Sequence, residues 1–127
     1  MGNPFGRLVG LRFEQHRAGF SELSLEVSDT HFNPNRVVHG AVIFALADTG
    51  MGAALHPTLA EGELCATVEI KISYFKPVTA GRLVCTTEIV NRGKTLANLE
   101  SRVFLDKTLV AQANGHYAIF TPRKAAS

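Results

Sequence analysis

Apolar residues follow two different periods along the chain, and the change of period separates one helix from the rest. The stretch from Val38 to Leu55 is rich in apolar residues, and from Ala41 to Ala47 almost every position is apolar, which predicts a helix buried on all sides. At about 16 residues, and with several glycines, this segment is too short to span a bilayer. Elsewhere apolar and polar residues alternate, as in strands with one buried face. The pattern therefore predicts one central helix and a sheet that covers it.

The alternating segments lie on both sides of the helix in the sequence. The predicted strands are 11–16, 23–27, 68–74, 83–90, 96–105 and 109–120, and turns are predicted at 77–81, 91–94 and 106–107. Because a single sheet must cover a fully apolar helix, we expect an α+β fold with a curved antiparallel sheet around it. Residues 1–127 are expected to form one domain, with 1–9 and 122–127 as loose ends.

The composition is that of an ordinary globular protein, with 46% hydrophobic and 19% charged residues. Residues 1–63 carry four Lys/Arg and seven Asp/Glu, whereas residues 64–127 carry nine and four. This asymmetry suits a phosphate-bearing ligand near the C-terminal half, but the basic residues are too dilute to indicate nucleic-acid binding. No signal peptide or membrane span is predicted, and Cys65 and Cys85 are expected to be reduced thiols of a cytoplasmic protein.

Two residues of the predicted helix carry candidate chemistry. Asp48 places a carboxylate in an apolar run, where a charge needs a partner or a function. Gly40 begins the helix without a Ser, Thr or Asp cap, so its N–H can receive a carbonyl oxygen. By contrast, Gly93-Lys94-Thr95 lacks the earlier glycine of a phosphate loop, because Glu88 stands there. No zinc-binding or serine-nucleophile motif is present.

The spacing of these residues predicts an oligomer. Asp48 lies nine residues after His39, which is about 13 Å along a helix axis and roughly half a turn out of phase. One chain's Asp48 therefore cannot readily reach a carbonyl held at its own Gly40. A site that uses both needs an antiparallel helix from a second copy, so we expect an isologous dimer with two shared sites.

Several motifs together resemble a known family. Asn33-Pro34 and His39-Gly40-Ala41, followed by Leu46-Ala47-Asp48, are similar to the hotdog-fold acyl-CoA thioesterases of the phenylacetate-degradation (PaaI-like) type. The segments 68–77 and 92–95 resemble strand and hairpin signatures of that family, and the likeness extends over residues 8–120. One position departs from the family pattern, because Ala41 replaces the second glycine of His-Gly-Gly.

The resemblance implies a fold, an assembly and a reaction. The fold would be a hotdog, dimeric and often tetrameric, and the reaction would be hydrolysis of an acyl-CoA with no cofactor beyond the CoA of the substrate. Asn33 and the Gly40 N–H would polarise the thioester carbonyl, and the partner's Asp48 would act as nucleophile or general base. Thr67 would help to position that attack, and His39 is a further candidate catalytic residue, as a proton shuttle. Basic residues expected to grip the CoA phosphates are Lys76, Arg92 and Lys94.

Other interpretations of these residues stay open. Asp48 could be a structural carboxylate, Asn33 a turn residue, His39 an orienter of the loop and Thr67 an ordinary strand residue. The segment His31-Phe32-Asn33-Pro34 is similar to the His-Phe-Pro segment of acyl-carrier-protein dehydratases, which use a histidine, and a non-catalytic acyl-CoA-binding module is a third possibility. The acyl group could be aryl, phenylacetyl or short to medium alkyl, with Phe44, Met51 and Phe75 as candidate pocket residues.

Overall fold

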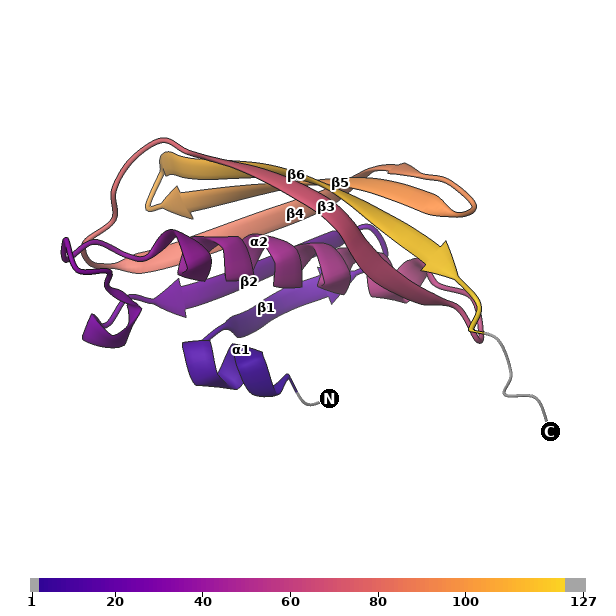
Figure 1. Cartoon of the computed structure of the whole chain (residues 1–127), viewed down its shortest axis with the longest axis horizontal. Helices are drawn as coiled ribbons and strands as arrows, with labels where there is room; N and C mark the ends of the chain where they lie inside the picture. Colours follow the sequence, from indigo (N-terminus) through magenta and orange to yellow (C-terminus); the bar gives the residue numbers. More distant parts are fainter. Residues whose placement is uncertain (1–2, 123–127) are drawn as a thin grey trace.

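Six antiparallel strands wrap around one long helix in the computed structural model, which describes residues 3–122 (Figure 1). The helices are α1 (Pro4–Val9) and α2 (Gly40–Leu55), with short 3-10 turns η1 (Asp29–His31) and η2 (His56–Thr58). The strands are β1 (Arg12–Arg17), β2 (Phe20–Glu26), β3 (Leu64–Tyr74), β4 (Arg82–Arg92), β5 (Leu96–Leu105) and β6 (Thr108–Phe120). The predicted α+β architecture with a central helix is confirmed.

The order of strands across the sheet is β1-β2-β4-β5-β6-β3, so β1 and β3 form the two edges. The sheet curves around α2, and β3 crosses the helix on the side that faces the viewer in Figure 1. Helix α2 therefore contacts nearly the whole sheet, and the large helix side chains that reach it are fully or almost fully buried: Ile43, Leu46, Met51 and Leu55. Because alanine and glycine fill most other inward positions, the helix and the sheet can approach each other closely.

A row of buried hydroxyl groups crosses the sheet beneath α2. Ser21, Thr87 and Ser101 lie opposite one another in β2, β4 and β5, and all three are fully buried. The Ser21 hydroxyl donates to the Gly50 carbonyl over 2.6 Å, and Ser101 donates to the Ala47 carbonyl over 3.3 Å. A Cβ atom on Gly50 would lie 2.7 Å from Thr87 Oγ1, so only glycine fits there. These contacts define the register of an otherwise apolar helix on the sheet.

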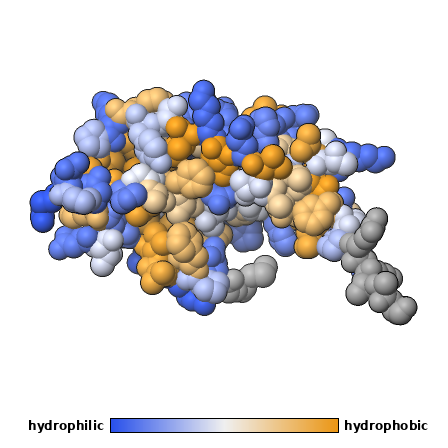
Figure 2. All heavy atoms as spheres, viewed as in Figure 1, coloured by the Kyte–Doolittle hydropathy of each residue, from blue (hydrophilic) through white to orange (hydrophobic). Residues whose placement is uncertain are grey.

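Edge strand β3 exposes apolar side chains although it lies against the central helix. Val68 is 62% exposed, and Leu64, Tyr74 and the following Phe75 are exposed by about half. Figure 2 shows apolar residues gathered across the middle of this face of the molecule, with a second group over α1. An unpaired strand edge of eleven residues, with several apolar side chains exposed, is a surface that can pair with another strand.

The N-terminal segment differs from the expectation of a loose end at residues 1–9, because residues 4–9 form α1. The Asn3 side chain accepts a hydrogen bond from the Gly6 N–H, and Gly10 ends the helix in the left-handed conformation. His31 Nε2 also contacts the Val9 carbonyl oxygen over 2.6 Å. Residues 1–2 and 123–127, also expected to be loose, lie outside the described residues. Within residues 3–122, no helix is long and apolar enough to cross a membrane.

Candidate active site

The Asp48 carboxylate is held by hydroxyl groups from two neighbouring strands. The Tyr117 hydroxyl, on β6, donates to Asp48 Oδ1 over 2.5 Å, and the Thr67 hydroxyl, on β3, donates to the same oxygen over 3.1 Å. Thr67 and Tyr117 are directly opposite each other in the β3–β6 pair, so one sheet position supplies both donors. The structure thus brings together two predicted site residues, Asp48 and Thr67, and adds Tyr117 to them.

Tyr117 was not a candidate in the sequence analysis. It lies on the inward face of β6, where its neighbours are small or apolar, and it is only 3% exposed. Burial raises the pKa of Tyr117 far above its usual range, and the hydrogen bond to Asp48 raises it further. The phenol therefore stays protonated and remains a donor at neutral pH. A sequence signal was present, because Tyr117 is the one residue with a hydroxyl at an inward position of residues 111–119.

The start of α2 differs from the expected uncapped terminus. His39 is its N-cap, and Nδ1 of the ring accepts a hydrogen bond from the Ala41 N–H over 2.9 Å. The Val42 N–H bonds to the His39 carbonyl over 2.9 Å. Among the hydrogen bonds of the described residues, none uses the Gly40 N–H. The predicted donor at Gly40 is therefore available, and the imidazole of His39 has a structural contact.

Tyr74, at the end of β3, packs against Gly40. Its hydroxyl donates to the Gly40 carbonyl oxygen over 2.9 Å, and a Cβ atom on Gly40 would lie 3.1 Å from the tyrosine ring and hydroxyl. Partial burial raises the pKa of Tyr74, which keeps this phenol a donor as well. Beside Gly40 lies an open cavity of about 280 Å³, lined by Val37, Val38, Gly40, Ile43 and residues 74–78.

Asn33 lies in the loop before α2 and shapes that loop. Its side-chain oxygen accepts hydrogen bonds from the N–H groups of Asn35 and Val37, over 2.9 and 3.4 Å. The Asn33 N–H in turn bonds to the Val37 carbonyl over 2.8 Å. In residues 3–122 no hydrogen bond joins Asn33 to Gly40. Because the side-chain oxygen of Asn33 accepts hydrogen bonds within the turn, only its amide NH2 group is available to a ligand.

Gly40 and Asp48 of one chain, both on α2, contact residues at different positions along β3. Gly40 contacts Tyr74, whereas Asp48 contacts Thr67, seven residues earlier in the same strand. On α2 the two residues are eight positions apart, which corresponds to about 12 Å along the axis. The structure of the single chain therefore does not bring the free N–H and the carboxylate to one carbonyl carbon, in agreement with the spacing argument.

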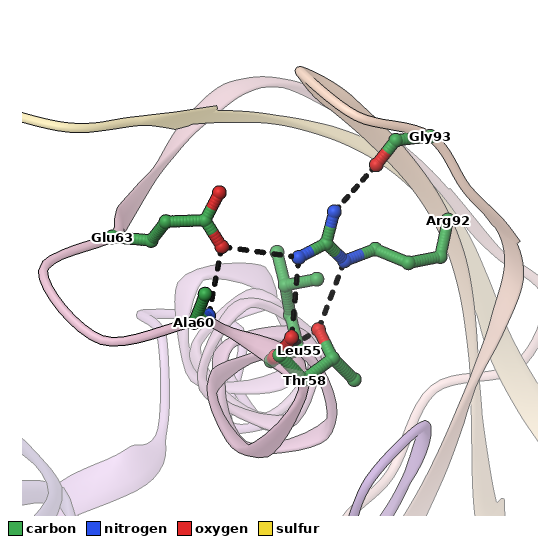
Figure 3. A network of polar contacts seen from close by, with 6 residues as sticks. All are labelled: Leu55, Thr58, Ala60, Glu63, Arg92 and Gly93. Carbon is green, nitrogen blue, oxygen red and sulfur yellow. Dashed lines mark hydrogen bonds and ion pairs between the residues drawn. The ribbon is translucent and has the colours of Figure 1, made fainter.

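The three candidate phosphate-binding residues have different surroundings. Lys76 is exposed and lines the cavity beside Gly40, and Lys94 is exposed in the β4–β5 hairpin turn. The Arg92 guanidinium instead lies inside a network at the end of α2 (Figure 3). It donates to the hydroxyl and the carbonyl oxygen of Thr58, to the Gly93 carbonyl and to Glu63. Arg92 thus joins the hairpin to the segment that follows α2.

Arg92→Met should lower the free energy of unfolding by about 2 kcal/mol, because it removes several charge-assisted hydrogen bonds in a half-buried setting. For an acyl-CoA, the substrate that the sequence resemblance implies, we expect KM to change by less than about twofold in this variant. Lys94→Met, in the same hairpin, is the matched comparison and should leave stability unchanged while raising KM. Chemical denaturation and steady-state kinetics measure both quantities. An increase in KM for Arg92→Met without loss of stability would instead support direct phosphate binding by Arg92.

The surroundings of other candidate nucleophiles and bases, His31, Cys65 and Cys85, do not favour catalysis. His31 is 7% exposed, and both ring nitrogens have hydrogen bonds, Nε2 with the Val9 carbonyl and Nδ1 with the Ser28 N–H. His31 therefore holds the loop in place and lacks the free nitrogen that a dehydratase base needs. Burial raises the pKa of Cys85 to about 11, and it raises the pKa of Cys65 in spite of nearby Arg92. Neither thiol is ionised at neutral pH. The described residues contain no group of three or more His, Cys, Asp or Glu side chains placed to hold a metal ion.

Two of the three candidate pocket residues lie outside the core. Phe75 is 52% exposed and lines the cavity beside Gly40, and Phe44 is half-buried on α2. Met51 is fully buried, and a Cβ atom on Gly115 would collide with its sulfur, so Met51 fills the core between α2 and β6. The prediction that Met51 lines a substrate pocket is not supported in the single chain.

Known proteins share both the sequence pattern and the fold. Residues 35–112 match the model of the thioesterase superfamily. A protein of Archaeoglobus fulgidus, whose name provisionally marks it as an esterase, is 31% identical over 111 residues, covering 85% of this chain and 70% of that protein. The solved structure of the conserved protein PA5202 from Pseudomonas aeruginosa is 28% identical with a TM-score of 0.87, over 94% of this chain and 96% of the other.

A further solved structure carries a functional name. It is a mutant of the phenylacetic acid degradation protein PaaI from Thermus thermophilus, 25% identical with a TM-score of 0.86, over 91% of this chain and 98% of that one. The family model covers more than half of the chain, and the aligned folds include the curved sheet and the central helix. The chain therefore belongs to the thioesterase superfamily, as a hotdog-fold thioester hydrolase of the PaaI-like type.

Proposed function

We propose that this protein hydrolyses acyl-CoA thioesters to a free acid and CoA, in a site shared by two copies of the chain. The observation that carries the proposal is the pairing of two features on one helix. Among residues 3–122, Gly40 offers a helix N-terminal N–H without a hydrogen-bond partner, and Asp48 offers a carboxylate with hydrogen bonds to one oxygen only. The first can stabilise an oxyanion, and the second can supply a base or a nucleophile.

With Asp48 as general base, its carboxylate takes a proton from water while the water oxygen bonds to the thioester carbon. The carbonyl oxygen becomes an oxyanion that accepts from the Gly40 N–H, and the Asn33 amide group lies on the same loop as a second donor. The intermediate then collapses, the C–S bond breaks, and the thiolate leaves and takes the proton from Asp48. With Asp48 as nucleophile, the carboxylate itself attacks, CoA thiolate leaves, and water hydrolyses the resulting anhydride.

The exposed edge of β3 suggests how two chains build this site. A second β3 that pairs antiparallel, with a two-fold axis between Ile70 and Lys71, brings residue 67 of one strand opposite residue 74 of the other. Tyr74 contacts Gly40 and Thr67 contacts Asp48. This pairing therefore brings the free N–H of one copy toward the carboxylate of its partner, and it covers the apolar edge. Further association of dimers into a tetramer is compatible with this arrangement.

The surroundings of Gly40 favour a substrate with an apolar acyl group and a phosphate-bearing carrier. Phe75 and Lys76 line the adjacent cavity, whereas Lys94 is exposed elsewhere, in the β4–β5 hairpin turn. We infer that Lys76 and Lys94 contact CoA phosphates, while Arg92 acts on the scaffold. The name of the Thermus thermophilus relative makes phenylacetyl-CoA the first substrate to test, followed by benzoyl- and medium-chain acyl-CoAs. Because both cysteines are free thiols, we also infer a cytoplasmic location.

The activity is tested with a panel of acyl-CoAs and a thiol-detecting dye, comparing kcat/KM across acyl groups. Release of CoA from at least one acyl-CoA is the expected result. Binding without CoA release would support the non-catalytic module, and hydration of an enoyl-CoA in place of thiol release would support the dehydratase interpretation. Light scattering on the same sample should give at least a dimer.

The shared site is tested by mixing two inactive variants, Asp48→Asn and Gly40→Pro, under conditions that exchange subunits. A mixed dimer has one intact composite site and one site with both changes. Random exchange at equal amounts should therefore restore about a quarter of the wild-type activity. Each variant exchanged with itself is the control. An absence of recovery despite verified exchange, or full activity in a monomer, would show that each chain carries its own site.

A further inference from the structure

We propose that Tyr117 is a positioning residue for the hydrolysis: it holds Oδ1 of Asp48 against the sheet, so that Oδ2 is the oxygen that reacts. The inference rests on the proposed function, because it assigns a role only if Asp48 acts on the thioester. It distinguishes the two carboxylate oxygens and adds a residue from a strand that carries none of the other candidate groups.

The two oxygens of Asp48 have different surroundings. Oδ1 accepts from both Tyr117 and Thr67, over 2.5 and 3.1 Å. Among the hydrogen bonds of the described residues, none uses Oδ2. A carboxylate with two donors on one oxygen has a defined side-chain orientation, and the lone pairs of its other oxygen remain free for a proton or a carbonyl carbon.

Tyr117 has one proton and two acceptors within reach. Its oxygen lies 3.0 Å from the Asp48 backbone carbonyl oxygen and 2.5 Å from Oδ1. The shorter contact is to a charged acceptor, and charge-assisted hydrogen bonds are the stronger ones. The proton therefore goes to the carboxylate. Since burial keeps the pKa of Tyr117 far above neutrality, this donor is present throughout the working pH range.

The two donors differ in how firmly the fold holds them. Tyr117 is buried and lies on β6, which pairs with β5 on one side and β3 on the other. Thr67 is exposed and lies on edge strand β3, next to an irregularity of the β3–β6 register between Thr67 and Glu69. A donor from the interior of a sheet holds its geometry better than one beside an edge bulge. Tyr117 is therefore the donor that fixes the orientation of the Asp48 carboxylate. Thr67 is the less rigid donor, and it lies where the partner strand can reach it.

Tyr117→Phe removes only the hydroxyl. We expect kcat to fall by about 10- to 100-fold while KM changes by less than about twofold, because misorientation of the reacting oxygen affects the chemical step and not substrate binding. In an Asp48→Asn background the same change should cause no further loss, since Tyr117 acts through the carboxylate. Tyr117→4-fluorophenylalanine, which fills the space of the hydroxyl without donating, should reproduce the loss if Tyr117→Phe is poorly folded.

Thr87→Val is the matched control, because it also removes a buried hydroxyl beneath α2 but one that contacts Ser101. It should lower Tm and leave kcat unchanged. Unchanged kcat in a folded Tyr117 variant would overturn the inference, as would losses that add to those of Asp48→Asn. An equal fall of kcat in Thr87→Val would also overturn it, because general loosening would then explain the effect. Normal turnover in Asp48→Asn itself would instead refute the proposed function.

Discussion

Asp48→Asn should reduce hydrolysis by at least ~100-fold while the protein stays folded, dimeric and able to bind acyl-CoA. The amide has nearly the volume of the carboxylate, and its oxygen can accept from the same two hydroxyl groups, Tyr117 and Thr67. Because both neighbours are donors, the amide oxygen takes the place of Oδ1. The NH2 group then occupies the reacting position, where it is neither a base nor a nucleophile.

The measurements are kcat, thermal unfolding, and calorimetric binding of a non-hydrolysable acyl-CoA thioether. Asp106→Asn is the matched control, because it makes the same chemical change in the β5–β6 turn at a positive φ of 55°, which asparagine tolerates. It should leave kcat and binding unchanged. Near-normal turnover and near-normal stability of Asp48→Asn would refute the enzymatic role. Unfolding of this variant, with normal turnover in the fraction that stays folded, would make Asp48 a structural carboxylate.

Gly40→Pro compared with Gly40→Ala should isolate the contribution of a single N–H group. Proline is favoured at the first position of a helix, and the preceding residue, His39, already has the extended φ and ψ of −60° and 135° that a following proline requires. Both variants add a Cβ atom 3.1 Å from Tyr74, whose exposed ring can shift by a few tenths of an ångström. Only proline removes the N–H.

We expect kcat of Gly40→Pro to fall about 100- to 1,000-fold below that of Gly40→Ala, the usual effect of removing one oxyanion donor. Gly40→Ala itself should lose only a few-fold, through the displacement of Tyr74. Steady-state kinetics of the two variants, with circular dichroism to verify equal helix content, provide the comparison. Equal kcat values in the two folded variants would mean that the Gly40 N–H does not contact the developing oxyanion.

Much of the fold could be predicted from the sequence, because burial leaves a local pattern. The central helix predicted within 38–55 is observed from Gly40 to Leu55, and strand β5 has its predicted bounds. The helix is not buried on all sides in the single chain, because Ala41 is exposed and Phe44 and Asp48 are half-buried. Asp48 could be identified as a candidate site residue from its position in that apolar segment, without knowledge of the sheet. Contacts that depend on register were not predictable, since the pairing of Thr67 with Tyr117 requires knowing which strands are neighbours and how they align.

The errors have physical causes of the same kind. His39 was not considered as a cap because imidazole is an uncommon one, yet its Nδ1 reaches the Ala41 N–H. Arg92 looked like a free cation in a hairpin, but the chain beyond α2 folds back beneath it and supplies acceptors at Thr58 and Glu63. Residues 4–9 looked like a loose end because a helix of six residues depends on its caps and on the distant His31.

The sheet has two open edges, and their difference bears on how the protein avoids aggregation. If β1 of one molecule paired with β3 of another, the contact would be head-to-tail and would propagate into an open filament. Strand β1 is short, has a register irregularity between Phe13 and Gln15, and exposes Arg12, Glu14 and Arg17. Short length, bulges and charge all discourage strand addition. Strand β3 also has a register irregularity, between Thr67 and Glu69, and exposes charged side chains, but its eleven residues make it longer than β1. In the proposed dimer, pairing with its own copy covers this edge.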